Sequence, residues 1–233
     1  MHALKHELKF LLPGDCTPSV LRILGHLAQA DPQHPRGFVE SVYFDTRTLA
    51  LLNEKINSDY LKTKVRVRWY PDAGQVASGP SFLELKRRIG TRRSKVRIET
   101  PYPAEVLSRS PLTGAELAGI PHLLRSHGMP VVEDFVPLLV VRYHRWRFVE
   151  PFTQARIALD TGILVPRTHA HFLPAANPTP LASAVLEVKS PHARLPERLA
   201  ILTELGCRKS SFSKYAACYA HVAAAGAMRR ADS

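Results

Sequence analysis

A row of basic residues recurs in the segment from Leu61 to Trp69. Lys64, Arg66 and Arg68 are spaced at the two-residue period of a β-strand, so they share one face of it, while the residues between them are apolar. A line of fixed cations suits a ligand with repeated negative charge, and the Arg guanidinium binds phosphate oxygens in a two-point geometry that Lys does not offer. The alternative is a solvated strand face that binds nothing.

Further segments show the same alternation of charged and apolar positions. They cover residues 5–12, 82–86, 95–99, 138–145, 156–160 and 186–189. Their charged positions include Lys5, Glu7, Lys9, Glu84, Lys86, Lys95, Arg97, Glu99, Arg142, His144, Arg156, Asp160, Glu187 and Lys189. Charged faces cannot pack against one another in a two-layer sandwich. We therefore expect a closed antiparallel barrel whose charged faces line a water-filled bore and whose apolar faces meet helices.

The elements around these strands complete the expected α+β fold. Apolar residues at helical spacing and end signals predict helices over residues 19–30, 46–55, 196–205 and 213–225. Segments rich in Pro and Gly at 71–80, 101–121 and 173–180 are expected to be loops. None of them is typical of an interdomain linker, so the whole chain, 1–233, is expected to form one domain.

The composition agrees with a polyanion ligand without choosing among polyanions. The net charge is +12 and the pI is near 10.0. Three cysteines without metal-type spacing predict reduced thiols and a cytoplasmic protein. No apolar run has the length of a membrane span and no signal peptide is recognisable, so we expect no membrane-spanning segment.

Eight short motifs, taken in order, resemble the vacuolar transporter chaperone (VTC) domain, the polyphosphate polymerase branch of the CYTH-like triphosphate tunnel enzymes. They are KHELKF at 5–10, SVYFDT at 41–46, KVRVRWY at 64–70, LELK at 83–86, VRYHR at 141–145, RIALD at 156–160, LEVK at 186–189 and SSFSKY at 210–215. The resemblance implies a barrel of about eight strands that binds a triphosphate or a longer phosphate chain.

The resemblance also implies roles for individual residues. The catalytic set would be Arg66, Arg68, Arg142, Arg156 and Lys214, and phosphate would further be bound by Lys9, Lys64, Lys86, Lys95 and Lys189. A Mn²⁺ or Mg²⁺ cofactor would be held by Glu187, with Glu7 and Glu84 as further candidates, because such ions take oxygen ligands and need only one or two from protein. For Glu7 and Glu84 the alternative is a counter-ion to a neighbouring Lys or Arg.

The implied activity is transfer of the γ-phosphoryl group of ATP, or of another nucleoside triphosphate, to a growing polyphosphate chain. The attacking atom is a phosphate oxygen, so the protein needs no nucleophile of its own. Two alternatives stay open: a triphosphatase or polyphosphate hydrolase, and a polyphosphate-binding module without turnover. Many relatives begin with Glu-x-Glu-x-Lys, whereas Lys5 occupies the first acidic position here, which argues against the hydrolase.

Nucleic acid is not expected as a partner. A single-strand binder interleaves exposed aromatic side chains with basic ones on the same face. Trp69 and Tyr143 instead fall opposite the cations of their strands, Lys64, Arg66 and Arg68 in the first case and Arg142 in the second.

Overall fold

The structure is a computed structural model that describes residues 6–71, 78–128 and 134–231, with side chains up to residue 229. Contacts within the chain group into two compact units that interleave along the sequence. Unit 1 comprises the segment ending at Phe38, Tyr143–Ile163 and Pro180–Phe212. Unit 2 comprises Val39–Arg142, Leu164–Thr179 and the segment beginning at Ser213. Each unit is described by itself.

Ten strands form an antiparallel sheet. Their bounds are β1 His6–Pro13, β2 Gln29–Ala30, β3 Arg36–Asp45, β4 Leu61–Trp69, β5 Phe82–Ile89, β6 Arg92–Glu99, β7 Val136–Val149, β8 Arg156–Thr168, β9 Ser183–Ser190 and β10 Arg208–Lys209. Hydrogen bonding places them in the order β10-β1-β9-β8-β7-β3-β4-β5-β6, and β2 pairs with β7 beside this path. The strands expected from alternation are all present among them.

The prediction of a closed eight-stranded barrel is wrong. Within the described residues the sheet has ten strands, and no pairing joins β6 to β10 at the two ends of its path. Closure requires a particular combination of tilt and stagger over all strands. Alternation within each strand shows which face is charged, but it carries no information on whether the last strand reaches the first. The α+β class with flanking helices is confirmed.

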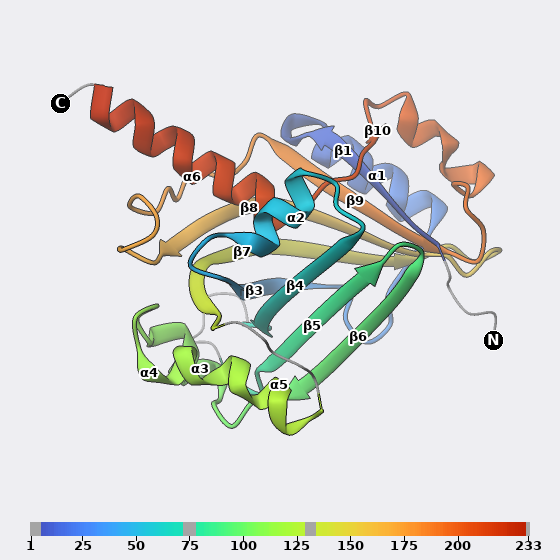
Figure 1. Cartoon of the computed structure of the whole chain (residues 1–233). Helices are drawn as coiled ribbons and strands as arrows, with labels where there is room; N and C mark the ends of the chain where they lie inside the picture. Colours follow the sequence, from blue (N-terminus) through green and yellow to red (C-terminus); the bar gives the residue numbers. More distant parts are fainter. Residues whose placement is uncertain (1–5, 72–77, 129–133, 232–233) are drawn as a thin grey trace. The chain divides into compact units, whose positions relative to one another are not determined.

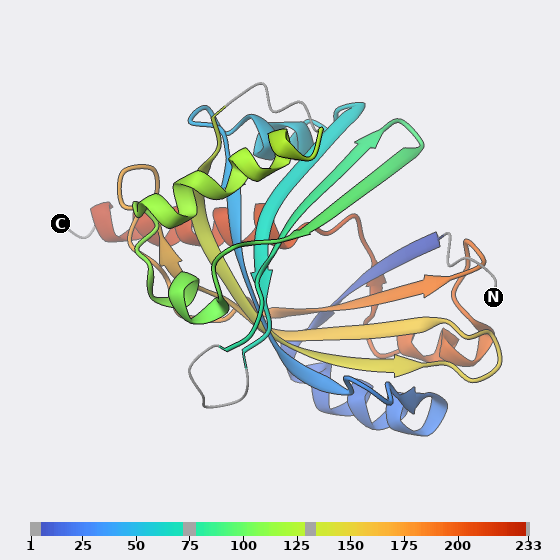
Figure 2. The ribbon, with the colours of Figure 1, turned by 90° about the horizontal axis from the view of Figure 1, so that it is seen from below.

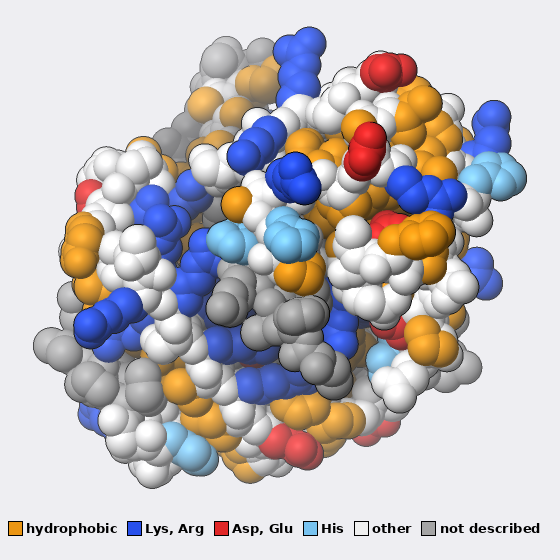
Figure 3. All heavy atoms as spheres, turned by 90° about the vertical axis from the view of Figure 1, so that its right-hand side faces the viewer, with side chains coloured by type: hydrophobic (Ala, Val, Ile, Leu, Met, Phe, Trp, Pro, Cys, Tyr) orange, Lys and Arg blue, Asp and Glu red, His pale blue; other side chains and the backbone are white. Residues whose placement is uncertain are grey.

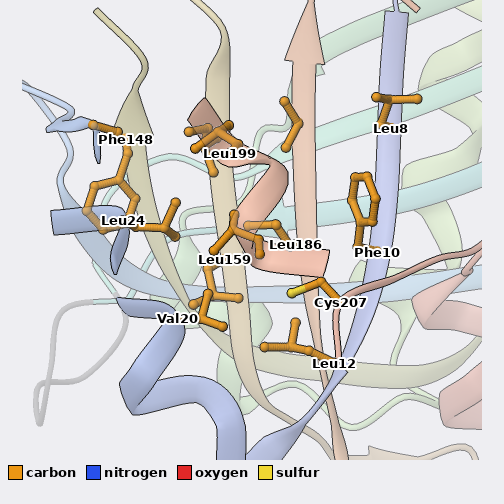
Figure 4. Packing of buried hydrophobic residues seen from close by; sticks show 14 of the residues in the cluster. Leu8, Phe10, Leu12, Val20, Leu24, Phe148, Leu159, Leu186, Leu199 and Cys207 are labelled. Atoms are coloured by element: carbon orange, nitrogen blue, oxygen red, sulfur yellow. The ribbon is translucent and has the colours of Figure 1, made fainter. Parts of the chain in front are cut away.

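The core of unit 1 lies between strands and two helical segments, α1 Thr17–Leu27 and the 3₁₀-helix η3 Glu197–Thr203. In Figure 2, β1, β9, β8 and β7 of this unit run side by side. Figure 4 shows Val20 and Leu24 of α1 and Leu199 of η3 among apolar side chains of these strands, such as Phe10 and Leu186. The short 3₁₀-helix η1, Gly14–Cys16, leads from β1 into α1.

The core of unit 2 packs the apolar face of β4 and β5 against several short helices. They are α2 Ala50–Ile56, α3 Ala104–Arg109, α4 Ala115–Gly119, η2 Ile120–His122 and α5 Leu123–Ser126. Figure 1 shows α3, α4 and α5 as a connected run of short helices (green). Their buried residues include Leu107, Leu117 and Leu124, which join Val67 and Trp69 in one apolar cluster. The prediction that 101–121 is a loop was therefore wrong, because tertiary burial of a few leucines overrides the weak local signal.

The other predicted helices are found with shifted ends. The helix expected over 19–30 is α1, the one over 46–55 is α2, and the one over 213–225 is the longer α6, Lys214–Ala231. The helix over 196–205 is the 3₁₀-helix η3. The segment 173–180 contains no helix or strand, as expected. Lys5 and most of the loop at 71–80 lie outside the described residues. Among the helices of the described ranges, none has both the length and the apolarity needed to cross a membrane.

Candidate functional site

The charged side of β4, β5 and β6 in unit 2 is strongly basic. Directly opposed residues of antiparallel strands point to the same side, and the registers align Arg66 with Glu84 and Arg97, and Lys64 with Lys86 and Lys95. We call this side the basic face. It comprises Lys62, Lys64, Arg66, Arg68, Phe82, Glu84, Lys86, Arg88, Arg93, Lys95, Arg97 and Glu99. Nine Lys or Arg residues thus stand against two Glu. On the surface drawn in Figure 3, Lys and Arg (blue) predominate over Asp and Glu (red).

Arg66 is buried and held by a carboxylate. Its Nε and Nη2 donate to Oε2 of Glu84 at 2.8 and 2.6 Å, and its Nη1 donates to the hydroxyl of Tyr43 at 3.3 Å. The other oxygen of Glu84 lies 3.1 Å from Nζ of Lys95. The side chain of Arg66 is therefore fixed in one orientation. Both oxygens of Glu84 are occupied by cations, which supports its alternative interpretation as a counter-ion.

Nearby positive charges lower the pKa values of two groups in this part of unit 2, the Glu84 carboxyl and the Tyr43 phenol. Burial by itself would raise the pKa of Glu84, but Arg66, Arg68 and Lys95 outweigh it and hold that pKa well below its usual range. Burial would likewise raise the pKa of the Tyr43 phenol, yet the positive charges of Arg66, Arg68 and Lys214 lower it. Both shifts show that this part of unit 2 favours negative charge.

Three more predicted residues lie with Arg66. Arg68 is 6% exposed and its Nε donates to the hydroxyl of Ser41 at 3.0 Å. Lys64 lies with Nζ 6.0 Å from the centre of the Tyr43 ring. Lys214, the first residue of α6, is 8% exposed and close enough to act on the Tyr43 hydroxyl. With Lys86 and Lys95, unit 2 thus brings together six of the predicted catalytic and phosphate-binding residues.

The N-terminus of α6 is tied to β3 by buried groups. The hydroxyl of Tyr215 donates to Oδ2 of Asp45 at 2.6 Å, and the Tyr215 ring stacks on Tyr43 with centroids 5.2 Å apart. Asp45 also accepts the backbone N–H groups of Leu51 and Leu52 at 2.8 and 2.9 Å, which satisfies two N–H groups in the first turn of α2. This network positions Lys214, the residue next to Tyr215.

Unit 1 carries a second group of charged side chains, with four cations and three carboxylates. The registers of β1, β9 and β8 align Glu7 with Lys189 and Arg156, and Lys9 with Glu187. Arg145 of β7 reaches the same surface, because its Nε and Nη2 donate to the two oxygens of Asp160 at 2.6 and 2.7 Å. We call this group the mixed-charge face. It contains Glu7, Lys9, Arg145, Arg156, Asp160, Glu187 and Lys189.

Arg145 was not predicted as a site residue, but in the structure it contacts two carboxylates of the mixed-charge face. Besides its pair with Asp160, its Nη2 lies 3.6 Å from Oε2 of Glu187. Burial by itself would lower the pKa of the guanidinium, but Asp160 and Glu187 raise it. Parity within the strand could not reveal it, because Arg145 lies on the side opposite Arg142 and His144, the positions expected to be charged.

Arg142 is placed differently from the other predicted arginines. Its Nε lies 2.5 Å from Oε1 of Glu40, and Oε2 of Glu40 accepts the indole N–H of Trp69 at 2.9 Å. Glu40 and Trp69 are directly opposed on β3 and β4, so they lie on the side of the sheet away from Arg66. The structure therefore does not bring Arg142 to the basic face.

The expectation that Tyr143 lies opposite the cations of its strand needs correction. Tyr143 shares a side of β7 with Arg145, whose guanidinium carbon lies 5.4 Å from the centre of the tyrosine ring. Tyr143 and Trp69 are 1% and 0% exposed, so neither ring offers a surface on which a base can stack.

The predicted metal ligands differ in their surroundings. Glu187 lies 3.7 Å from Nζ of Lys9 and 3.6 Å from Nη2 of Arg145. Glu7 lies 3.1 Å from Nζ of Lys9. Its burial raises its pKa and nearby Glu187 does the same, but Lys9 and Lys189 lower it, and the net shift is downward. Glu7 and Glu187 are thus neighbouring carboxylates on one face.

This pair fits an ion that needs few protein ligands. Within the described part of the chain, no group of three or more His, Cys, Asp or Glu side chains is placed to hold a metal ion. Mg²⁺ is commonly bound through one or two carboxylates, with water and phosphate oxygens completing its shell. Glu187 and Glu7 offer that donor set, whereas Glu84 is buried and accepts two N–H groups of Arg66 besides its contact with Lys95.

Residues 4–223 match the family model of the VTC domain. The chain belongs to the VTC domain family. The match confirms the resemblance indicated by the eight motifs and covers all the residues of the two charged faces of this VTC domain. Among curated proteins, none matches the sequence.

Solved structures similar to this VTC domain include three putative cyclases. One, a putative adenylyl cyclase from Hippeastrum described as having a dominant triphosphatase activity, is 19% identical, with 90% of this chain and 92% of that chain covered and a TM-score of 0.43. A putative adenylate cyclase from Vibrio parahaemolyticus is 13% identical, with 89% and 94% covered and a TM-score of 0.49. One from Bacillus halodurans is 12% identical, with 89% and 92% covered and a TM-score of 0.46.

Proposed function

We propose that this VTC domain is a metal-dependent polyphosphate polymerase, which transfers the γ-phosphoryl group of ATP to the end of a growing polyphosphate chain. The observation that carries the proposal is the basic face of unit 2, where nine Lys or Arg residues lie in register with only two Glu. Family membership supports the same ligand class.

The basic face suits a transfer reaction that depends on positioning. Arg66 and Arg68 are almost fully buried, and their side chains are held by Glu84 and Ser41. Oriented guanidinium groups bind phosphate oxygens without first having to be ordered, and they offset the negative charge that gathers on a phosphoryl group in transfer. Lys64, Lys86, Lys95 and Lys214 add point charges around them.

The nucleophile in this proposal is a terminal phosphate oxygen of the chain. It is anionic before it attacks, so no general base is required to remove a proton. The bond between the γ-phosphorus and the bridging oxygen of ATP breaks, the new phosphorus–oxygen bond lengthens the polymer by one unit, and ADP leaves. Side chains then need only hold donor and acceptor in line.

On the mixed-charge face of unit 1, Arg156, Lys189 and Lys9 would bind phosphate oxygens. Glu187, with Glu7, would hold Mn²⁺ or Mg²⁺, which would add positive charge on that face. Arg142, paired with Glu40 on the other side of its strand, has no assigned contact with phosphate in this proposal.

The test is product analysis. Purified protein is incubated with ATP and Mn²⁺ or Mg²⁺, and products are resolved on a polyphosphate-stained gel beside assays of ADP and free phosphate. Polymer that accumulates with ADP supports the proposal. Free phosphate without polymer assigns a hydrolase, and tight polyphosphate binding without turnover assigns a binding module; either result overturns it.

A variant at Arg68 tests whether polymer formation depends on the basic face. Arg68→Gln should abolish polymer formation, because it removes one of the two buried guanidinium groups of the basic face. Arg87→Gln is the matched control: Arg87 lies on β5 but on the other side of the sheet, opposed to Ser94 and Thr63. An equal loss of polymer formation in both variants would show that the activity does not depend on the basic face.

A further inference from the structure

The basic face continues past the predicted phosphate ligands toward the hairpin between β5 and β6. The register aligns Lys62, Arg88 and Arg93 across the three strands, directly beside the row of Lys64, Lys86 and Lys95. We call Lys62, Arg88 and Arg93 the outer row. Lys62 is partly buried, while Arg88 and Arg93 are exposed. The function proposed above assigns no individual role to the three residues of the outer row.

This arrangement is unfavourable for the protein alone. Like charges directly opposed on neighbouring strands destabilise a sheet, and the outer row aligns three cations with no carboxylate among them. The row of Arg66, by contrast, includes Glu84 between Arg66 and Arg97. In the described part of the chain, no ion pair within 4.0 Å joins a member of the outer row to Asp or Glu. A bound polyanion would relieve the repulsion.

The rows are spaced for an extended ligand. Residues two apart on a strand are separated by about 6.6–6.8 Å. Four successive rows, from that of Arg68 to the outer row, therefore span roughly 20 Å along β4. A triphosphate is too short to contact all four rows, so the outer row can be reached together with Arg66 and Arg68 only by a longer chain.

The side chains of the outer row favour inorganic polyphosphate over single-stranded nucleic acid. Nucleic-acid grooves combine cations with aromatic rings on which bases stack. The outer row and the row of Lys64 contain only Lys and Arg. Phe82, the aromatic residue on the same face of β5, is covered by Arg97, whose guanidinium carbon lies 3.8 Å from the ring centre.

We propose that Lys62, Arg88 and Arg93 form an outer subsite that binds the part of a polyphosphate chain beyond the triphosphate-binding residues and so sets how long a product the domain retains. This inference rests on the proposed function, which assigns the basic face to phosphate. It adds a length-dependent site that a triphosphate does not fill.

The test compares two double variants that remove the same charge from the same hairpin. Arg88→Gln/Arg93→Gln removes two members of the outer row. Arg87→Gln/Arg92→Gln changes the neighbouring arginines, which point to the other side of β5 and β6. Binding of tripolyphosphate, of a long polyphosphate and of single-stranded DNA is measured by titration at several salt concentrations.

For long polyphosphate we expect Arg88→Gln/Arg93→Gln to weaken binding about 4- to 25-fold, since each of the two lost ion pairs contributes a factor of roughly two to five. The slope of log affinity against log salt should become shallower by about one to two, as expected when two phosphate contacts are lost. Tripolyphosphate affinity should stay within twofold of wild type. Arg87→Gln/Arg92→Gln should leave all three affinities nearly unchanged, and products made by the outer-row variant should be shorter.

Three results would overturn the inference. Equal effects of the two double variants would show a general charge effect without a site. Equal weakening for tripolyphosphate and long polyphosphate would place the outer row in the triphosphate site. DNA that binds as tightly as polyphosphate, with the same loss in the outer-row variant, would assign nucleic acid as the ligand. A wild-type protein that binds neither phosphate ligand would instead refute the proposed function itself.

Discussion

Glu84→Gln is the substitution for which the structure makes the sharpest prediction. Glu84 is 3% exposed and neutralises two cations, Arg66 at 2.6 Å and Lys95 at 3.1 Å. Removing one partner of a buried ion pair typically costs about 3–5 kcal/mol, because the remaining charge stays buried without compensation. The amide keeps one oxygen that can accept from Arg66, so we expect a loss of about 3 kcal/mol in the free energy of unfolding at pH 7.

The pH dependence distinguishes this explanation from simple loss of packing. The pKa of Glu84 is lower in the folded protein than its unfolded value of about 4.3. The ionised carboxylate therefore contributes fully above pH 4.3, and its contribution declines as the pH falls below that value, by about 1.4 kcal/mol per pH unit while the folded group stays ionised. The difference between wild type and Glu84→Gln should shrink accordingly, from about 3 kcal/mol at pH 7 to about 1 kcal/mol at pH 3.

Urea unfolding followed by Trp69 fluorescence measures this difference in unit 2. The chain has two tryptophans, so a Trp146→Phe background leaves the buried Trp69 as the sole reporter. Glu99→Gln is the control: Glu99 is an exposed carboxylate on the same face, and its loss should change stability by less than about 0.5 kcal/mol. A loss below about 1 kcal/mol for Glu84→Gln at pH 7, or one that is constant down to pH 3, would refute the reasoning.

Three further predictions concern other parts of the chain. Glu187→Gln should lower polymerase activity at every Mn²⁺ or Mg²⁺ concentration, whereas the exposed Glu204→Gln should not; unchanged metal dependence would remove Glu187 from the metal site. Tyr215→Phe deletes the hydrogen bond to buried Asp45 and should lower the free energy of unfolding in urea by about 2 kcal/mol, since bonds to charged groups contribute about 1.5–3 kcal/mol. Tyr219→Phe is the control, and an equally small loss for both variants would contradict this role of Tyr215. Burial raises the pKa of the Cys207 and Cys218 thiols to about 11 and about 12. Alkylation at pH 8 followed by mass spectrometry should therefore label at most Cys16 in the native protein and all three thiols in urea. Rapid labelling of all three thiols in the native protein would show that this packing is wrong.

The sequence by itself determined the strands and the residues that share a face. Alternation is a local property, since successive side chains of a strand always point to opposite sides. For that reason Lys64, Arg66 and Arg68 were correctly grouped, and the alternating segments 82–86 and 95–99 correctly predicted the strands β5 and β6. Eight short motifs likewise predicted the family correctly, because each preserves residue types at a set spacing.

Only the tertiary structure decided which partner each charge meets and how the strands join. Arg142 and Arg145 lie on opposite sides of β7, and nothing local to that strand shows that Arg145 meets Asp160 while Arg142 meets Glu40. Glu84 became a counter-ion through contacts with residues on two other strands. The helices between residues 104 and 126 form because a few leucines are buried against distant strands. The prediction of a closed barrel was wrong for the same reason, because pairing of the first and last strands depends on the geometry of the whole sheet.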